Sequence, residues 1–209
     1  MTKKNVGDKL PIYKLKTPEE ILDYYRDWTA KNKYNHDMVE MNYTAPKETV
    51  SVLTKHAFQK DLKILDAGCG TGLVGIELKK HNYSNIDGVD FSQNMLDLVP
   101  KDIYKNLKKF DLNKPLNYKN NTYDVVICVG TFTYGHVKAH ALDELIRIIK
   151  NKGLICFTIN EGIYEEYKFD KKIKQLTDSK SWNIKEFFKS NYIVSKNVNA
   201  WLCLAEINN

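Results

Sequence analysis

The chain has 209 residues, 43% of them hydrophobic and 28% charged, which is ordinary for one soluble globular domain with a full core. No apolar run approaches the length of a bilayer span and no apolar stretch follows the N-terminal lysines, so we expect a cytoplasmic protein with neither a membrane segment nor a secretion signal. The net charge of +6 comes almost entirely from scattered lysines, with Arg26 and Arg147 as the only arginines, and this argues against a nucleic-acid partner.

Residues 1–60 are predicted to form a tail and a helical cap, and residues 61–209 the core of the same domain. The tail, residues 1–16, is polar and lysine-rich, and we expect it to be loosely held. A helix is predicted to start after Thr17, because Pro18 follows as the first helical residue and Glu20 completes a capping box. A second helix is predicted from Thr44 onward, and the two helices would form the cap.

The stretch Ile64–Gly72 is the most informative feature of the chain. An apolar run ends in Asp66, glycines follow at alternate positions, and an amphipathic helix begins at Leu73. A strand thus passes through a glycine-rich turn into a helix, where backbone N–H groups and the positive helix end face a ligand. The NAD fingerprint requires a third glycine at the position of Leu73, so this ligand need not be a dinucleotide.

A second signal follows 18 residues later. Residues 85–90 have the pattern of a strand and end in Asp90, whose carboxylate can accept two hydrogen bonds from a ribose diol. Ser92 is a suitable cap for a helix that Pro100 would stop.

Strands and helices then alternate, which predicts parallel strands with right-handed crossovers. The predicted strands lie near residues 62–66, 85–90, 106–111, 123–129 and 153–159, and the predicted helices near residues 72–81, 93–99, 139–150 and 162–177. The tail of the chain differs, because Trp182–Val194 and Val198–Ile207 have the pattern of two long strands joined by a few residues, which must run antiparallel.

With these motifs the chain resembles the class I S-adenosylmethionine-dependent methyltransferases. The matching segments are Leu65–Gly72, Gly88–Ser92 with Met95-Leu96, Phe110–Leu112, Tyr123–Ile127, and the Leu142–Lys150 helix that leads into Gly153–Ile155. The resemblance implies a Rossmann-like α/β fold, with a seven-stranded, mostly parallel sheet, an antiparallel last strand and helices on both faces.

Within that class the chain is most similar to the Williams–Beuren syndrome chromosome region methyltransferase-like proteins. The features are Asp37–Glu40, Tyr43–Lys47, Gly72–Gly75 and the run Val129–Val137. The acid that follows Tyr34 in the family is Asn35 here, so no role is carried over to that position.

The resemblance implies S-adenosylmethionine as cofactor and a set of residues that bind it. Asp66 would help to hold the amino group, Asp90 the ribose hydroxyls, and Asp111 with the Leu112 N–H the adenine. The full set of expected cofactor contacts is Asp66, Gly68, Cys69, Gly70, Thr71, Gly72, Asp90, Phe91, Met95, Asp111, Leu112 and Val129.

The acceptor side follows the fourth strand, where the Asn/Asp-Pro-Pro-Tyr motif of many nucleic-acid amine methyltransferases is replaced by Cys128–Thr131. This favours a small-molecule acceptor. Aromatic residues are expected to wall its pocket: Trp28, Tyr34, Tyr43, Phe132 and Tyr134. His136 is the candidate general base, and a structural role for it stays open.

The four cysteines, Cys69, Cys128, Cys156 and Cys203, form no C-x-x-C pair and are expected to be reduced, packed thiols without a metal. The sequence therefore predicts a methyltransferase that acts on an oxygen or nitrogen of a small molecule. Three alternatives remain: an RNA or protein methyltransferase, a non-catalytic S-adenosylmethionine-binding partner protein and, more distantly, an NAD-linked dehydrogenase.

Overall fold

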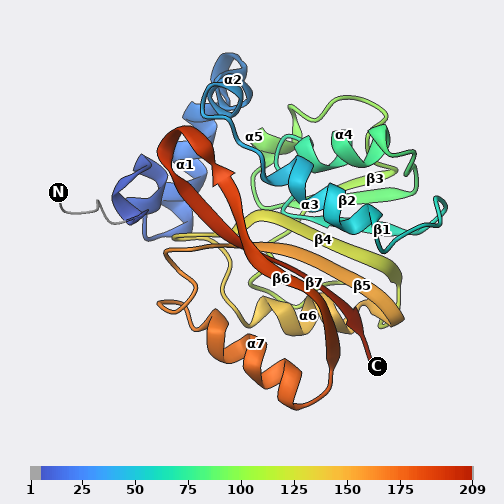
Figure 1. Ribbon diagram of the computed structural model, residues 1–209. Coiled ribbons are helices and arrows are strands. Elements are labelled where there is room, and N and C mark those ends of the chain that lie inside the picture. The colour runs from blue at the N-terminus through green and yellow to red at the C-terminus, as the bar shows by residue number, and fades with distance from the viewer. Residues whose placement is uncertain (1–5, 209) are drawn as a thin grey trace.

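The computed structural model describes residues 6–208, and within them seven strands form one sheet (Figure 1). The strands are β1 (Ile64–Ala67), β2 (Ile86–Asp90), β3 (Asn106–Lys109), β4 (Tyr123–Phe132), β5 (Ile149–Asn160), β6 (Trp182–Ile193) and β7 (Val198–Ile207). Their order across the sheet is β3-β2-β1-β4-β5-β7-β6, and β7 runs antiparallel to both of its neighbours. The predicted Rossmann-like sheet with an antiparallel last strand is confirmed.

Helices cover both faces of this sheet (Figure 1). The helices α3 (Ala45–Thr54), α4 (Leu73–Lys80) and α5 (Gln93–Leu96) lie on one face, and α6 (Ala141–Arg147) and α7 (Phe169–Asp178) lie on the other. The prediction that the second helix belongs to a cap is wrong, because α3 packs against α4 and against β4 to β7. Its Val50 and Leu53 side chains are completely buried there, so α3 is part of the core.

The N-terminal segment, residues 6–43, contains η1 (Val6–Asp8), η2 (Pro11–Lys14), α1 (Pro18–Thr29), η3 (Ala30–Asn32) and α2 (Lys33–Glu40). The predicted capping box of α1 is present, because Glu20 N donates to Thr17 Oγ1 and Thr17 N donates to a carboxylate oxygen of Glu20. The expectation of a loosely held tail is wrong for residues 6–16. Tyr13 is buried and accepts a hydrogen bond from Asn160 at 3.1 Å, whereas residues 1–5 lie outside the described part of the chain.

The tip of the β6–β7 hairpin holds the end of this segment. Thr44 N donates to Tyr192 O at 3.1 Å, and Val194 N donates to Asn42 O at 3.2 Å. Figure 1 shows the hairpin reaching across the sheet edge to α1 and α2. The last two strands therefore do more than complete the sheet, since they also position the segment that precedes α3.

Several element boundaries differ from the sequence prediction. The helix predicted over residues 162–177 begins only at Phe169, because Lys168 adopts a left-handed conformation with φ of 61°. The helix predicted over residues 139–150 ends at Arg147, since Ile149 already pairs with Tyr123 as the first residue of β5. The third strand and the α5 helix also end earlier than predicted, at Lys109 and Leu96.

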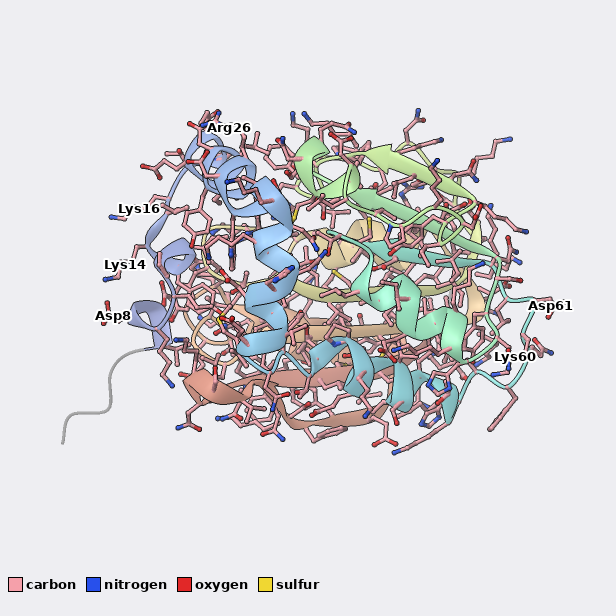
Figure 2. All side chains as sticks on the ribbon, turned by 90° about the horizontal axis from the view of Figure 1, so that it is seen from above. Asp8, Lys14, Lys16, Arg26, Lys60 and Asp61 are labelled. Carbon is pink, nitrogen blue, oxygen red and sulfur yellow. The ribbon has the colours of Figure 1, made fainter. Side chains whose placement is uncertain are left out.

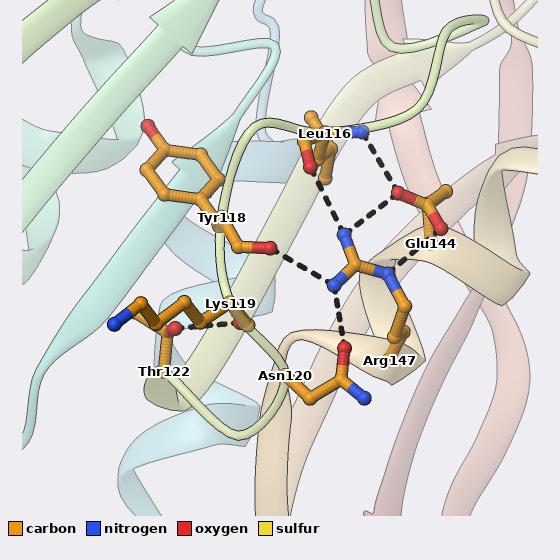
Figure 3. A network of polar contacts seen from close by, with 7 residues as sticks. All are labelled: Leu116, Tyr118, Lys119, Asn120, Thr122, Glu144 and Arg147. Carbon is orange, nitrogen blue, oxygen red and sulfur yellow. Dashed lines mark hydrogen bonds and ion pairs between the residues drawn. The ribbon is translucent and has the colours of Figure 1, made fainter.

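Arg147 fixes the loop that connects β3 to β4 (Figure 3). Its guanidinium donates to the backbone carbonyls of Leu116 and Tyr118, to the Asn120 side chain and to both carboxylate oxygens of Glu144. All five N–H donors of the guanidinium are thereby used. Arg147, at the end of α6, thus stabilises the loop that contains Asp111.

No helix among residues 6–208 combines the length and the apolar character that a membrane crossing requires. The four cysteines are free and buried, and burial raises the pKa of the Cys128 thiol to about 12.

Candidate functional site

A cavity lies at the carboxyl ends of the parallel strands, and we call it the strand-end pocket. Crevices at this edge are where open α/β sheets bind ligands, because the strand order reverses there. The residues that line the pocket and were expected to bind the cofactor are Gly68, Gly70, Asp90, Phe91, Met95, Asp111, Leu112 and Val129. The N-terminal segment closes the other side of the pocket with Pro18, Ile21, Tyr25 and Tyr34.

The glycine turn and the end of β2 are tied together by Asp90. Gly70 N donates to one carboxylate oxygen of Asp90, and Ser92 N donates to the other, each at 2.8 Å. Burial raises the pKa of Asp90, while these backbone hydrogen bonds oppose that rise. The carboxylate is therefore held in one orientation at the pocket wall, where it can accept hydrogen bonds from a diol.

Asp66 lies beneath the glycine turn and does not line the pocket. Its side chain is completely buried, and Tyr104 Oη donates to its Oδ2 at 2.6 Å. Its Oδ1 accepts no hydrogen bond from any described residue. Burial raises the pKa of Asp66 to about 7, so the buried carboxyl binds a proton far more readily than an exposed one.

Asp111 and Leu112 follow β3 at the opposite wall of the strand-end pocket. Asp111 Oδ1 accepts a hydrogen bond from Asn113 N at 2.9 Å, which fixes the carboxyl at the start of the loop. Met95 and Leu112 supply buried apolar surface between Asp90 and Asp111. This wall can therefore receive a flat, partly polar group such as a purine.

A second cavity adjoins the first, and we call it the aromatic chamber. Both cavities are lined by Tyr25, Tyr34, Tyr43, Gly130 and His136. The chamber is also lined by Leu10, Ile12, Tyr13, Trp28, Met38, Thr133, Tyr192 and Ile193. Because five residues belong to both walls, a molecule in the chamber would lie next to one in the strand-end pocket.

The lining of the chamber consists of apolar, aromatic and hydroxyl side chains with one histidine. Among the described residues, none that lines it is an Asp, Glu, Lys or Arg. Figure 2 shows three charged side chains of the N-terminal segment, Lys14, Lys16 and Arg26, projecting from the outer surface. The chamber therefore suits a small apolar or aromatic molecule, or a cation attracted to the ring faces.

Trp28 is held in this wall by polar and aromatic contacts. Its indole N–H donates to Asp37 at 2.6 Å, and its ring packs edge-on against Tyr34 at a centroid distance of 4.9 Å. The Tyr25 ring stacks on its other side at 6.2 Å. These contacts join α1 to α2 and fix the side chains that face the chamber.

His136 lies at the junction of the two cavities. Its Nδ1 is 2.6 Å from the Tyr134 carbonyl oxygen, and its Nε2 is 2.8 Å from the Tyr25 hydroxyl. Burial lowers the pKa of His136, and the Lys138 ammonium lowers it further, while the hydrogen bond to the Tyr134 carbonyl opposes both effects. The imidazole is thus neutral near pH 7 and firmly oriented.

Two of the residues expected in the acceptor pocket lie elsewhere. Phe132 is almost completely buried in the core, where its ring packs against Phe157 and Phe169. The Tyr134 ring packs between Tyr13 and Tyr167, and only its carbonyl reaches the site. The expectation failed because β4 is a central strand with buried residues on both faces, so that Phe132 packs into the core beside Phe157 and Phe169 and not toward the site.

The remaining expected cofactor residues, Cys69, Thr71 and Gly72, support the turn from below. The Cys69 sulfur packs under Gly88, and Gly72 precedes α4 with φ of 91°. The Thr71 hydroxyl donates to Asn35 Oδ1 at 2.6 Å, which links the turn to α2. These side chains shape the pocket without lining it.

The contributors that sequence reasoning missed include Tyr13, Asn35, Tyr104 and Tyr192. Tyr13 and Tyr192 come from opposite ends of the chain, so no local spacing could reveal that they share a wall. Tyr104 follows the short α5 helix in an irregular stretch, where no periodicity marks it. An aromatic count alone could have suggested that some tyrosines were functional, because the chain has 13 of them.

The residues of the strand-end pocket fit S-adenosylmethionine. A Cβ at Gly70 would meet no atom within 4 Å, so this backbone faces open space that a ligand can fill. The fixed Asp90 carboxylate suits the ribose diol. The Asp66 oxygen without a hydrogen-bond partner would be stabilised by a positively charged group or by a proton below the turn. Within residues 6–208 no cluster of His, Cys, Asp or Glu could hold a metal ion.

Comparison with known proteins agrees with this geometry. Residues 64–153 match the family described as "Methyltransferase domain". An uncharacterized protein of Methanocaldococcus jannaschii is 30% identical over 77% of this chain and 72% of its own length. Methyltransferase-like protein 27 of Homo sapiens is 34% identical over 66% of this chain, and the match spans 56% of the human protein, little more than half of its length.

The fold recurs in solved structures. Magnesium protoporphyrin IX methyltransferase from Synechocystis PCC 6803, solved with bound S-adenosylhomocysteine, matches 91% of this chain and 99% of its own with a TM-score of 0.66 at 15% identity.

Proposed function

Because the chain belongs to the class I S-adenosylmethionine-dependent methyltransferases, we propose that it transfers the cofactor's methyl group to an oxygen or nitrogen of a small molecule held in the aromatic chamber. The observation that carries the proposal is the adjacency of the two cavities through five shared residues. A cofactor in the strand-end pocket would present its reactive group at this junction.

We propose that the strand-end pocket holds S-adenosylmethionine in a defined orientation. Asp90 would accept the ribose hydroxyls, and Asp111 with the Leu112 N–H would bind the adenine. Gly68 and Gly70 would admit the ribose and the methionine part, while Asp66 would favour the cofactor's amino group from below. When bound, the sulfonium supplies an electrophilic methyl group, and the protein's contribution is to align the acceptor with it and to exclude water.

A small acceptor is favoured by the composition of the chamber walls. Its walls come from both ends of the chain, and its uncharged lining gives no counterpart for a phosphate backbone. The alternative is an RNA or protein acceptor, and the exposed lysines of the N-terminal segment support it. A steep fall in acceptor binding with rising salt would favour that alternative.

Within the class, we place the chain nearest the Williams–Beuren syndrome chromosome region methyltransferase-like proteins, on the run Val129–Val137. We also propose a reducing, cytoplasmic location, which the four free and buried cysteines support. Membership of this subgroup does not identify the acceptor, so the class of acceptor is inferred from the lining of the aromatic chamber.

The experiment that tests the proposal is calorimetric titration with S-adenosylmethionine and S-adenosylhomocysteine. Asp90→Ala should abolish measurable binding, whereas Asp97→Ala, an exposed acid just beyond α5, should leave the affinity unchanged. Binding without turnover against any small-molecule extract would instead support a non-catalytic partner protein. Absence of binding to the wild-type chain would contradict the proposal.

A further inference from the structure

The contact between Tyr25 and His136 is a polar pair in an otherwise apolar wall. The two residues come from α1 and from the loop after β4, and both line the strand-end pocket and the aromatic chamber. Tyr25 Oη lies 2.8 Å from His136 Nε2, and the two rings meet edge to face at 5.7 Å. Any molecule that spans the junction of the cavities therefore meets this pair.

The hydrogen bonds of His136 determine its tautomer. A backbone carbonyl can only accept, so the 2.6 Å contact with Tyr134 O requires a proton on Nδ1. In the neutral imidazole Nε2 then carries a lone pair, and Tyr25 Oη must donate to it. The Tyr25 oxygen has a lone pair left to accept a hydrogen bond from a bound molecule.

We propose that Tyr25 and His136 form a proton relay that takes the proton of an acceptor hydroxyl during methyl transfer, so that the acceptor is an alcohol or a phenol. This inference rests on the proposed function and deepens it, because it chooses oxygen over nitrogen. Tyr25 is the catalytic residue that touches the acceptor, and His136 acts through it as the final proton acceptor.

The step balances as follows. The acceptor oxygen forms a bond to the methyl carbon while the carbon–sulfur bond breaks, and that electron pair stays on sulfur. The acceptor proton moves to Tyr25 Oη as the Tyr25 proton moves to His136 Nε2. The site loses the positive charge of the sulfonium and gains that of the imidazolium, so its net charge does not change.

The surroundings keep this pair ready to accept a proton. The titratable and charged groups around His136 are the phenols of Tyr13, Tyr25, Tyr34, Tyr43 and Tyr192, the carboxyls of Asp90 and Asp111, and the Lys138 ammonium. Burial raises the pKa of Tyr25 well above its usual value, so the phenol is no base by itself and must pass its proton on. Burial lowers the pKa of His136, so the acid limb of the rate profile should lie below pH 6.5.

Two acceptors of the same shape test the proposal: para-cresol, which keeps its proton at pH 8, and para-thiocresol, which is already ionised there. The rate of transfer to cresol divided by the rate to thiocresol should fall about 100-fold or more in Tyr25→Phe and in His136→Gln. The control His81→Gln, an exposed histidine after α4, should leave this ratio unchanged. An unchanged ratio in both relay variants would overturn the relay.

Nitrogen NMR of the S-adenosylhomocysteine complex gives a second readout that needs no acceptor. His136 should show a protonated Nδ1 and a bare Nε2 at pH 7.5, and Tyr25→Phe should shift the Nε2 signal. A protonated Nε2 would overturn the relay, because no lone pair would face Tyr25.

The two proposals fail in different ways. Loss of S-adenosylhomocysteine binding in the wild-type chain refutes the proposed function. Transfer to neither cresol nor thiocresol with the cofactor bound refutes a phenol as the acceptor, and the screen of small-molecule extracts then decides the proposed function. Transfer to thiocresol alone, with binding intact, refutes only the relay.

Discussion

Gly68 and Gly70 occupy the same turn, but their surroundings differ, so substitution of Gly68 should affect stability and substitution of Gly70 should affect ligand binding. Both have positive φ, of 80° and 54°. A Cβ at Gly68 would lie 2.0 Å from Thr131 Oγ1, whereas a Cβ at Gly70 would meet nothing within 4 Å. We predict that Gly68→Ala lowers the free energy of unfolding by about 2–5 kcal/mol, through steric overlap and backbone strain.

Gly70→Ala should cost only about 1 kcal/mol, from the left-handed backbone. Its methyl group would project into the strand-end pocket, so the variant should fold but bind S-adenosylhomocysteine much more weakly. Urea denaturation and calorimetric titration of the two variants check both statements. Equal loss of stability in the two variants would contradict the difference in packing on which this prediction depends.

Asp66 makes the stability of the ligand-free protein depend on pH. Its pKa is about 7 in the folded chain, compared with about 3.9 in an unfolded one. The folded state therefore binds a proton that the unfolded state has lost between these values, and stability falls as pH rises from about 4 to 7. The full effect above that range is of the order of 4 kcal/mol.

We predict that Asp66→Asn, which keeps an acceptor for Tyr104, removes most of this slope and is more stable than the wild-type chain at pH 8. Burial also raises the pKa of Asp90, so a smaller dependence of stability on pH, with the same sign, should remain in this variant. Asp87→Asn is the matched control, because both oxygens of Asp87 accept hydrogen bonds, and it should lose stability. Urea denaturation at pH 5, 6.5 and 8 measures these differences, and a wild-type stability that rises over this range would contradict them.

At the scale of elements, the loop after β3 depends on one side chain. Arg147 makes five hydrogen bonds, four of which reach Leu116, Tyr118 and Glu144, while the fifth reaches Asn120 (Figure 3). A lysine can make at most three and lacks the planar fork. We predict that Arg147→Lys lowers the free energy of unfolding by about 1–3 kcal/mol.

Because this loop contains Asp111 and Leu112, Arg147→Lys should also weaken S-adenosylhomocysteine binding several-fold. The other arginine is the control, since Arg26 is exposed and pairs with Asp23 on the surface. Arg26→Lys should change neither stability nor affinity measurably. An Arg147→Lys variant with unchanged affinity would mean that the loop keeps its conformation without the guanidinium.

The elements differ in how far their sequence predicts them. The β1 turn, the α1 capping box and the final hairpin were predictable because their signals are local: alternate glycines, Thr17 with Glu20, and two long strand patterns joined by a few residues. The start of α7 was not, since a left-handed Lys168 ends a series of turns that has helical spacing. The aromatic chamber was only half predictable, because Tyr13 and Tyr192 reach it through long-range packing.

At the scale of the whole molecule, the N-terminal segment lies over the sheet edge as a separate layer (Figure 1). Its polar contacts with the core include Asn35 with Thr71, Tyr13 with Asn160, Tyr25 with His136, and residues 41–44 with the hairpin tip. Left-handed residues flank α2, at Asn32 before it and Asn42 after it. A short helix between two such joints can change its position as one unit, because only a few dihedral angles need to move.

We predict that S-adenosylhomocysteine slows amide hydrogen exchange about tenfold or more in α1 and α2, since the ligand would fill the pocket that Ile21, Tyr25 and Tyr34 cover. Amides in the centre of β4 and β5, which are buried on both faces, should change little. Asn35→Ala should reduce the added protection, because it removes the contact between α2 and the glycine turn, whereas Asn94→Ala on the exposed side of α5 should not. Equal protection of α1 and α2 with and without the ligand would mean that the segment is already closed in the free protein, and that the acceptor must enter the chamber by another route.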